Sequence, residues 1–213
     1  MRAPVRLFLA SSNPGKLEEY RALARAAEFA SPGEARIALE LLPEFESLTA
    51  FEENAPTFAE TATGKALHYS RFCDGLVFAD DSGLVVPSLG GAPGVLSARY
   101  AGPSASSAER NAKLLHELSG KSGRQRAAYF VCAIGLAEHG RAKAIVTARV
   151  DGEISQTPRG DRGFGYDPVF YVSALGKGFA DISADEKNEH SHRGRAFRKL
   201  LAFLWCDTLT GQS

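Results

Sequence analysis

The chain has 213 residues, of which 44% are hydrophobic and 23% are charged. These proportions are typical of a globular domain and disfavour a disordered, collagen-like or coiled-coil protein. The 25 Lys and Arg residues balance the 25 Asp and Glu residues. The chain therefore has no excess of cations for binding DNA or RNA, and we expect no nucleic-acid partner.

We find no stretch of about 18 consecutive apolar residues, so we expect no membrane span. The first residues do not form the apolar run and cleavage site of a signal peptide. Cys73, Cys132 and Cys206 are too few and too widely spaced for a disulfide framework or a CxxC metal pair. These features predict a cytoplasmic protein with reduced thiols.

Strand and helix patterns alternate through the first half of the chain. Short apolar runs bounded by turn residues predict strands, and apolar residues at intervals of three and four predict helices. The expected elements are a strand at 5–10, a helix at 17–27, a strand at 37–42, a helix at 58–72, and extended segments at 76–79 and 84–86. Asn13 can cap the first helix, with Pro14 at its first position.

The second half predicts a β-hairpin and a final helix. The expected elements are a glycine- and proline-rich loop at 90–102, a helix at 104–118, strands at 127–136 and 144–150, and a helix at 194–209. His139-Gly140 supplies the turn between the two strands. This order favours an α/β fold with a mixed sheet. We expect one domain over residues 1–213, with two lobes and a central cleft.

The segment between the first strand and the first helix is a candidate phosphate site. A tight turn into a helix presents backbone N–H groups at the positive end of the helix dipole. Lys16 in the first helical turn opposes that dipole, which makes sense if its ammonium group meets an anion. The segment differs from the P-loop pattern, and a simple capped turn remains the alternative. Its residues are Ser11, Ser12, Asn13, Pro14, Gly15 and Lys16.

Asp80 and Asp81 follow a short apolar strand and precede Ser82. Two adjacent carboxylates repel one another, so the pair favours a bound proton or cation. Mg²⁺ takes one or two carboxylates together with phosphate oxygens and water, and a carboxylate there can accept a proton from an attacking water. A turn that closes the strand is the alternative. Nearby acidic residues that suit either a metal site or a helix N-terminus are Glu52, Glu53 and Glu60.

Two further clusters suit a purine nucleoside. Residues 163–168 combine glycines, which permit close approach, with two aromatic rings that offer stacking faces and a carboxylate acceptor. Hydrogen-bond donors lie close together in the sequence at Lys187, His192 and Arg193. Such donors can bind a keto oxygen of a purine base, whereas an amino group at the same position could not accept their hydrogen bonds. An aromatic core turn and a solvated helix cap are the respective alternatives. Together, the four clusters describe a nucleoside triphosphate site.

Six blocks of the sequence resemble the inosine/xanthosine triphosphate pyrophosphatases. They occur in the family's order, at 11–16, 79–84, 89–95, 97–102, 163–170 and 186–188 with 191–196. The resemblance implies an elongated, two-lobed fold around a mixed sheet, with the nucleotide in the central cleft, and a homodimer. It also implies Mg²⁺-dependent hydrolysis of ITP, dITP or XTP to the monophosphate and pyrophosphate.

The same resemblance implies roles for individual residues. Asp81 would be the proton acceptor and a metal ligand, with Glu52 as the second metal carboxylate. Residues 54–55 depart from the family pattern, so Asp80, Glu53 and Glu60 are alternative ligands. Residues 11–16 and Ser82 would hold the triphosphate. The nucleoside would be held by Phe164, Gly165, Tyr166, Asp167, Lys187, His192 and Arg193.

Two rival functions are consistent with the same motifs. One is a pyrophosphatase that acts on modified pyrimidine or standard nucleotides in a related fold. The other is a module that binds nucleotides without turnover, although two extra negative charges beside a phosphate would not help such a module.

Overall fold

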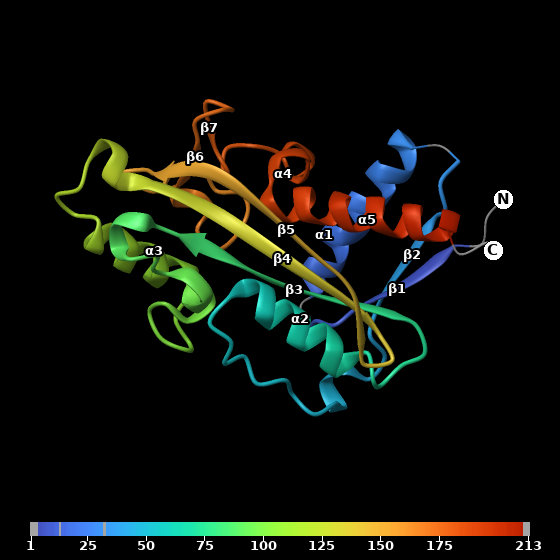
Figure 1. Cartoon of the computed structure of the whole chain (residues 1–213). Helices are drawn as coiled ribbons and strands as arrows, with labels where there is room; N and C mark the ends of the chain where they lie inside the picture. The colour runs from blue at the N-terminus through green and yellow to red at the C-terminus, as the bar shows by residue number, and fades with distance from the viewer. Residues whose placement is uncertain (1–3, 13, 32, 211–213) are drawn as a thin grey trace. The chain divides into compact units, whose positions relative to one another are not determined.

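The computed structural model describes residues 4–12, 14–31 and 33–210 and contains a mixed sheet of seven strands in the order β2-β1-β3-β4-β5-β6-β7 (Figure 1). β1 pairs in parallel with β2 and β3, whereas β6 pairs antiparallel with β5 and β7. The strands are β1 (Val5–Leu9), β2 (Ile37–Leu41), β3 (Leu76–Val85), β4 (Ala127–Glu138), β5 (Arg141–Ile154), β6 (Phe170–Val172) and β7 (Lys177–Gly178). The helices are α1 (Pro14–Ala30), α2 (Phe58–Tyr69), α3 (Ser107–Glu117), α4 (Ala184–His190) and α5 (His192–Thr210). The expected mixed α/β class is confirmed.

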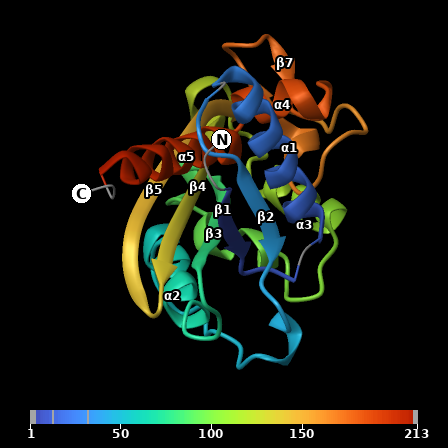
Figure 2. The same cartoon turned by 90° about the vertical axis from the view of Figure 1, so that its right-hand side faces the viewer.

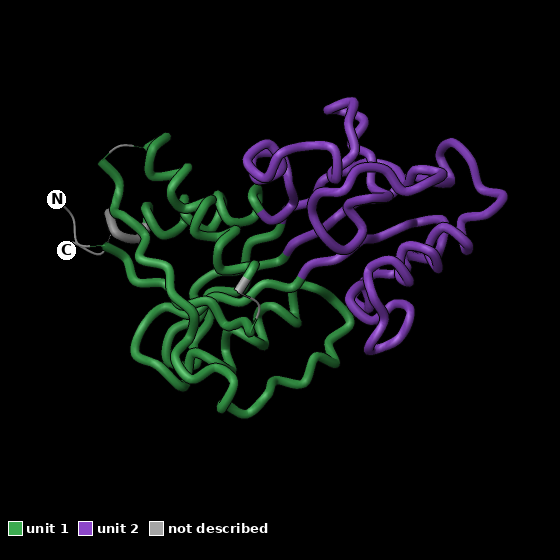
Figure 3. Tube along the Cα trace, turned by 180° about the vertical axis from the view of Figure 1, so that it is seen from behind, with its two compact units in different colours: residues 1–81, 133–147, 194–213 green, residues 82–132, 148–193 purple. Residues whose placement is uncertain are grey.

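The chain divides into two compact units (Figure 3). The first comprises residues 1–81, 133–147 and 194–213, and the second comprises residues 82–132 and 148–193. The boundaries fall inside β3, β4 and β5 and near the start of α5, so each unit holds part of these elements. Each unit has its own core.

The core of the first unit forms on both faces of β1 and β3, because side chains alternate between faces along a strand. On one face, Phe78 of β3 packs edge-to-face with Tyr20 of α1 at 5.0 Å between ring centroids, and Phe197 of α5 lies 4.9 Å from Tyr20. On the other face, Val77 shares a buried cluster with Ala66 of α2. Figures 1 and 2 accordingly show α1 and α5 on one side of these strands and α2 on the other.

α2 approaches β4 very closely at Gly135. A Cβ atom added to Gly135 would lie 2.7 Å from the carbonyl oxygen of Ala62, which is rigid helix backbone. Only glycine permits this spacing. The contact fixes the depth of α2 one turn before Lys65, a residue of the candidate site.

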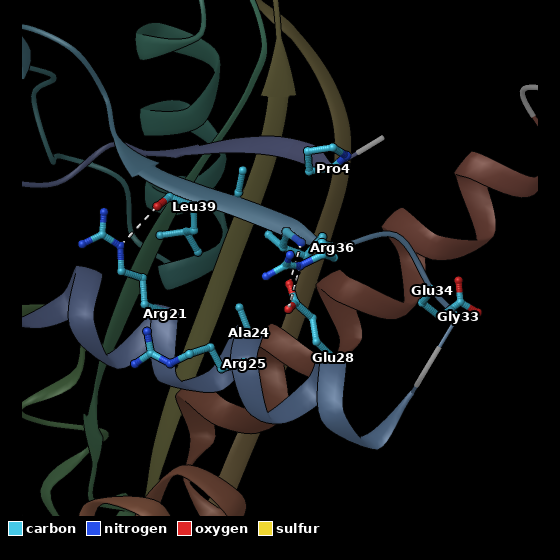
Figure 4. A pocket seen from close by; sticks show the side chains of 11 residues that line it. Pro4, Arg21, Ala24, Arg25, Glu28, Gly33, Glu34, Arg36 and Leu39 are labelled. Carbon is cyan, nitrogen blue, oxygen red and sulfur yellow. Dashed lines mark hydrogen bonds and ion pairs between the residues drawn. The ribbon is translucent and has the colours of Figure 1, made fainter. Parts of the chain in front are cut away.

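Side chains of α1 cover the outer edge of β2, the terminal strand of the sheet (Figure 4). Glu28 accepts a hydrogen bond from the Ile37 N–H at 2.8 Å, and the Arg21 Nε–H donates to the Leu39 carbonyl oxygen at 3.3 Å. This occupies backbone groups that an added strand would otherwise bind. A cavity of about 800 Å³ lies beside this edge, and none of the expected site residues that the structure describes lines it.

The core of the second unit is rich in aromatic rings. Phe130 of β4, Phe170 of β6 and Phe179 lie 4.6 to 5.9 Å apart between ring centroids. Beside them, the buried guanidinium of Arg126 satisfies its N–H groups on backbone carbonyls, as a buried cation must. The oxygens that it binds most closely, at 2.6 to 3.0 Å, belong to Leu118, Ile154 and Ser155.

The expected elements are mostly confirmed, with differences in β3 and in three short elements of the second half. His139-Gly140 forms the turn of the hairpin, with φ of 48° and 74°. The break expected after residue 79 is wrong, because β3 continues to Val85; the buried Leu84 is held there by hydrogen bonds to Ser97 Oγ. The short strands β6 and β7 and the short helix α4 were not expected from the sequence. None of the described helices has the length and apolar character needed to cross a membrane.

Candidate active site

Asp80 lies inside β3 and is paired with Lys16 of α1. The Lys16 Nζ donates to Asp80 Oδ1 at 2.8 Å, and the Asp80 side chain is 1% exposed. The Lys16 ammonium group opposes the dipole of α1, and the anion that it meets is therefore the Asp80 carboxylate. We expected the two carboxylates to lie side by side at the end of a strand. Because Asp80 and Asp81 are instead consecutive residues within β3, their side chains leave the strand on opposite faces of the sheet.

Asp81 lies on the α2 side of β3, among charges from α2 and the segment before it. Burial raises the pKa of Asp81 from its ordinary 3.8 to about 6; Lys65 opposes the shift, whereas Glu53 and Asp80 add to it. Lys65 Nζ is 2.5 Å from Glu53 Oε1. Asp81 is thus a carboxylate whose ionised form is poorly compensated by its surroundings, which suits a group that gains a cation or a proton.

The three glutamates expected near the metal differ in their surroundings. Glu53 is the one that pairs with Lys65 and influences Asp81. Glu52 is exposed and accepts a hydrogen bond from Asn54 Nδ2 at 3.2 Å. Glu60 accepts from the hydroxyl of Thr57, the N-cap residue of α2, at 2.8 Å. The structure therefore brings Glu53, rather than Glu52 or Glu60, into the electrostatic environment of Asp81.

The segment expected to bind phosphate lies next to a second cavity of the first unit. Ser11 and Ser12 line a cavity of about 640 Å³ together with residues 41–42 and 44–47. Gly15 and Lys16 form the first turn of α1, as expected. Asn13 lies outside the described residues, as does the Pro14 side chain, so the proposed cap and these two phosphate contacts stay predictions.

In the second unit, residues 163–168 form a turn held from inside by Asp167. The Asp167 Oδ2 accepts hydrogen bonds from the Phe164 N–H at 2.8 Å and from Lys187 Nζ at 2.5 Å. Gly163 has φ of 76°, and a Cβ atom there would lie 2.2 Å from the same oxygen. Asp167 is 3% exposed and Tyr166 is 4% exposed, with its hydroxyl donating to the Ser97 carbonyl oxygen. Both residues therefore shape the turn.

Phe164 is the aromatic ring of this turn that remains open to a ligand. It is 58% exposed. Lys187 Nζ lies 4.5 Å from the ring centroid, and Arg193 Cζ lies 5.6 Å from it. Two cations on an aromatic face hold it by cation–π attraction. Of the two aromatic residues expected to offer stacking faces, the structure leaves this one exposed.

The three donors expected to read the base are brought together and are largely buried. His192 stacks on Phe130 with 4.7 Å between ring centroids and 6° between planes. Arg193 Nη2 donates to Ser82 Oγ at 3.3 Å, which ties the start of α5 to β3. Lys187 and Arg193 share the Phe164 ring, so the sequence cluster is one structural cluster.

Comparison with known proteins matches residues 7–203 to the Ham1 family. This chain belongs to the Ham1 family. It is 46% identical over 194 residues to the dITP/XTP pyrophosphatase of Geobacillus kaustophilus, covering 91% of each chain, and 46% identical to that of Gloeobacter violaceus, covering 92% of each. A solved structure of a HAM1 protein from Coxiella burnetii matches with a TM-score of 0.82 at 40% identity, covering 94% of this chain and 98% of that one. The expected family is confirmed.

Two polar residues of this Ham1 chain belong to the site's surroundings and were not expected from its sequence. Lys65 is three or four residues from the buried Ala62 and Tyr69 of α2 and therefore lies on the buried side of that helix. Asn111 lies one turn before the buried Leu114 of α3. A polar residue on the apolar stripe of a helix is the signal that could have found both.

Proposed function

We propose that this Ham1 chain hydrolyses purine nucleoside triphosphates that carry a wrong base, namely ITP, dITP and XTP, to the monophosphate and pyrophosphate. The observation that carries the proposal is Asp81, a partly buried carboxylate with a raised pKa beside Glu53 and Lys65. Two relatives that match more than nine tenths of this chain are dITP/XTP pyrophosphatases, and this similarity supports the proposal.

In the proposed reaction, the Asp81 carboxylate accepts a proton from an attacking water. The water oxygen forms a bond to the α-phosphorus, the bond from that phosphorus to the bridging oxygen breaks, and pyrophosphate leaves with the electron pair. Proton transfer of this kind contributes about 10²–10⁴-fold to rate. Ser11, Ser12, Gly15 and Ser82 would hold the phosphates by hydroxyl and backbone N–H groups.

Mg²⁺ suits the carboxylates Asp81 and Glu53 of the first unit, although the described residues form no group of three or more potential metal ligands. A divalent cation would stabilise the ionised form of Asp81, which burial disfavours. We propose that Asp81 and Glu53 hold it, because Glu53 is the glutamate that acts on Asp81, with Glu52 as the alternative. When bound, Mg²⁺ supplies neutralisation of the phosphate charge. It needs only one or two protein carboxylates, since substrate oxygens and water complete its shell.

Comparing the neighbouring variants Glu53→Gln and Glu52→Gln tests the metal assignment. We expect Glu53→Gln to raise the Mg²⁺ concentration for half-maximal activity by at least about tenfold, in the range seen when a supporting group of a metal site is lost. Glu52→Gln, which changes an exposed carboxylate of the same size and charge, should stay within about twofold of the unmodified protein. If Glu52→Gln instead raised the Mg²⁺ requirement while Glu53→Gln left it unchanged, the metal would be assigned to Glu52.

Base selectivity would reside in the second unit. Phe164 offers the stacking face, and Lys187, His192 and Arg193 offer donors to the keto oxygen at C6. The amino group of ATP would leave these donors unpaired, at a cost of about 1–3 kcal/mol each. We also infer a homodimer in the cytoplasm, acting as a single two-lobed domain over residues 1–213.

A substrate panel read by pyrophosphate release tests the proposed function. With Mg²⁺, the purified chain should release pyrophosphate from dITP, XTP and ITP, and release it at least about fivefold less efficiently from ATP, the lower end of the cost given above. EDTA should abolish turnover. Equal use of ATP or of modified pyrimidine nucleotides would favour a pyrophosphatase of other specificity. Binding without pyrophosphate release would favour a sensing module.

A further inference from the structure

Asn111 is a buried polar residue of α3 in contact with the base-binding turn of the second unit. It is 6% exposed, and its Nδ2 donates to the carbonyl oxygen of Gly165 at 3.0 Å. It lies on the same helical stripe as Leu114 and Leu118, which are fully buried. An amide therefore occupies a position that the helix pattern would give to an apolar side chain.

The orientation of this amide follows from what it faces. A carbonyl oxygen only accepts, so the NH₂ end of Asn111 must point to Gly165. The other end, Oδ1, is buried and has no hydrogen-bond partner within the described ranges. A buried acceptor left in this state destabilises the fold. A leucine at this position would extend the apolar stripe and avoid that penalty, so stability alone does not require asparagine here.

The hydrogen bond from Asn111 ties the turn to an element outside it. Gly165 has φ of 64° and follows Phe164 directly. It lies within the short loop that the hydrogen bond from the Phe164 N–H to the Asp167 side chain closes. Tyr166 makes the second such tie through the Ser97 carbonyl oxygen at 2.9 Å. α3, Ser97 and the turn all belong to the second unit (Figure 3). Since Phe164 is the exposed ring and Gly165 follows it directly, a hydrogen bond to the Gly165 carbonyl restrains the backbone that carries that ring.

We propose that Asn111 is a positioning residue that holds the Phe164 ring in the orientation for stacking on the substrate base. The proposal rests on the proposed function for the identity of that base, a purine. Asn111 itself does not touch the substrate. It acts on the Gly165 carbonyl, and the turn transmits its effect to the ring.

The variant Asn111→Leu separates this role from a structural one. Base stacking on an aromatic ring corresponds to about 5- to 150-fold in affinity, so Phe164→Ala should raise KM for ITP within that range. Asn111→Leu should raise KM by about 5- to 10-fold, a part of the same effect, with kcat changed less than about twofold. Its melting temperature should stay close to that of the unmodified protein, because the unpartnered buried acceptor is gone while the Gly165 carbonyl oxygen loses its donor.

A double-mutant cycle identifies the path of the effect. If Asn111 acts through the ring, Asn111→Leu adds nothing to KM once Phe164 is alanine. Inorganic tripolyphosphate has no base, so its inhibition constant should be the same for all variants. Leu115→Ala, on the same helix and partly buried against the core of the second unit, makes no hydrogen bond to the Gly165 carbonyl; it should lower the melting temperature and leave KM for ITP unchanged.

Additive KM effects in the cycle, an altered inhibition constant for tripolyphosphate, or a fall in kcat at constant KM would each overturn the proposal. Should Asn111→Leu fail to fold, Asn111→Ala is measured in its place with the same expectations for KM and for the cycle. The unmodified protein is assayed first. Its failure to hydrolyse ITP or XTP counts against the proposed function, whereas full activity with an unchanged KM in Asn111→Leu counts against the role of Asn111 alone.

Discussion

Replacing Asp81 with asparagine should lower turnover of ITP by at least about 10²-fold while making the metal-free protein more stable at neutral pH. The loss of turnover follows from removing the proposed proton acceptor, which contributes about 10²–10⁴-fold in enzymes. Asparagine has the same shape, so substrate binding in the second unit should be preserved. Opposite changes in activity and stability are expected where a site holds a charge that the fold alone does not favour.

The pH dependence of the stability gain follows from the pKa of Asp81. That pKa is raised from 3.8 to about 6 on folding, so the folded protein binds the proton more tightly than the unfolded chain does. Above pH 6 the ionised carboxylate destabilises the fold by on the order of 3 kcal/mol, and below about pH 4 both states are protonated and the penalty is lost. Asp81→Asn should therefore gain stability at pH 7.5 and lose that gain as the pH falls from 6 to 4.

Urea unfolding in EDTA at pH 7.5 and pH 4.5 measures this gain. Asp80→Asn is the matched control, because it changes the neighbouring carboxylate in the same strand. Asp80 is paired with Lys16 at 2.8 Å, so its loss leaves a largely buried ammonium without this partner and should destabilise the protein. Equal stability changes in the two variants would contradict the different surroundings assigned to Asp80 and Asp81.

The sequence predicted the positions of the motifs well because each motif is a local feature of a strand end, a turn or a helix start. The His139-Gly140 turn, the strand before residue 11 and the cation cluster around the start of the last helix depend on short-range residue chemistry. The same reasoning failed at Asp80 and Asp81. Asp, Ser and Gly favour turns locally, yet burial of Leu84 in the second core keeps β3 extended, and tertiary packing overrides the local preference.

The residues that the sequence did not reveal owe their roles to contacts between distant segments. Lys65 joins the site because α2 packs against β4 at Gly135, and Asn111 joins it because α3 packs beside residues 163–168. The helix pattern can single out both polar side chains, but it does not show which distant segment each of them meets. The preference for Glu53 over Glu52 has the same origin, because adjacent glutamates are equivalent in sequence until one of them meets Lys65.

Replacing Lys187 with methionine should lower the free energy of unfolding by about 3–5 kcal/mol, because it breaks a buried ion pair by removing one partner. Lys187 Nζ lies 2.5 Å from Asp167 Oδ2, and their side chains are 11% and 3% exposed. The variant leaves the Asp167 carboxylate buried without its cation. Adding Asp167→Asn removes that charge and keeps an oxygen to accept from the Phe164 N–H, so the double variant should regain most of the lost stability.

Urea unfolding of both single variants and the double variant gives the coupling energy of this pair. Lys177→Met is the matched control in the same unit: its ion pair with Glu186 is more exposed, and its loss should cost less than about 1 kcal/mol.

The stability and the substrate selectivity of the double variant should then respond differently. The double variant regains its fold but still has no cation at 4.5 Å from the Phe164 ring and no lysine donor for a keto oxygen. The KM of the double variant for ITP should stay raised, and its selectivity for ITP over ATP should be reduced. If KM and selectivity recovered together with stability, Lys187 would be a purely structural residue.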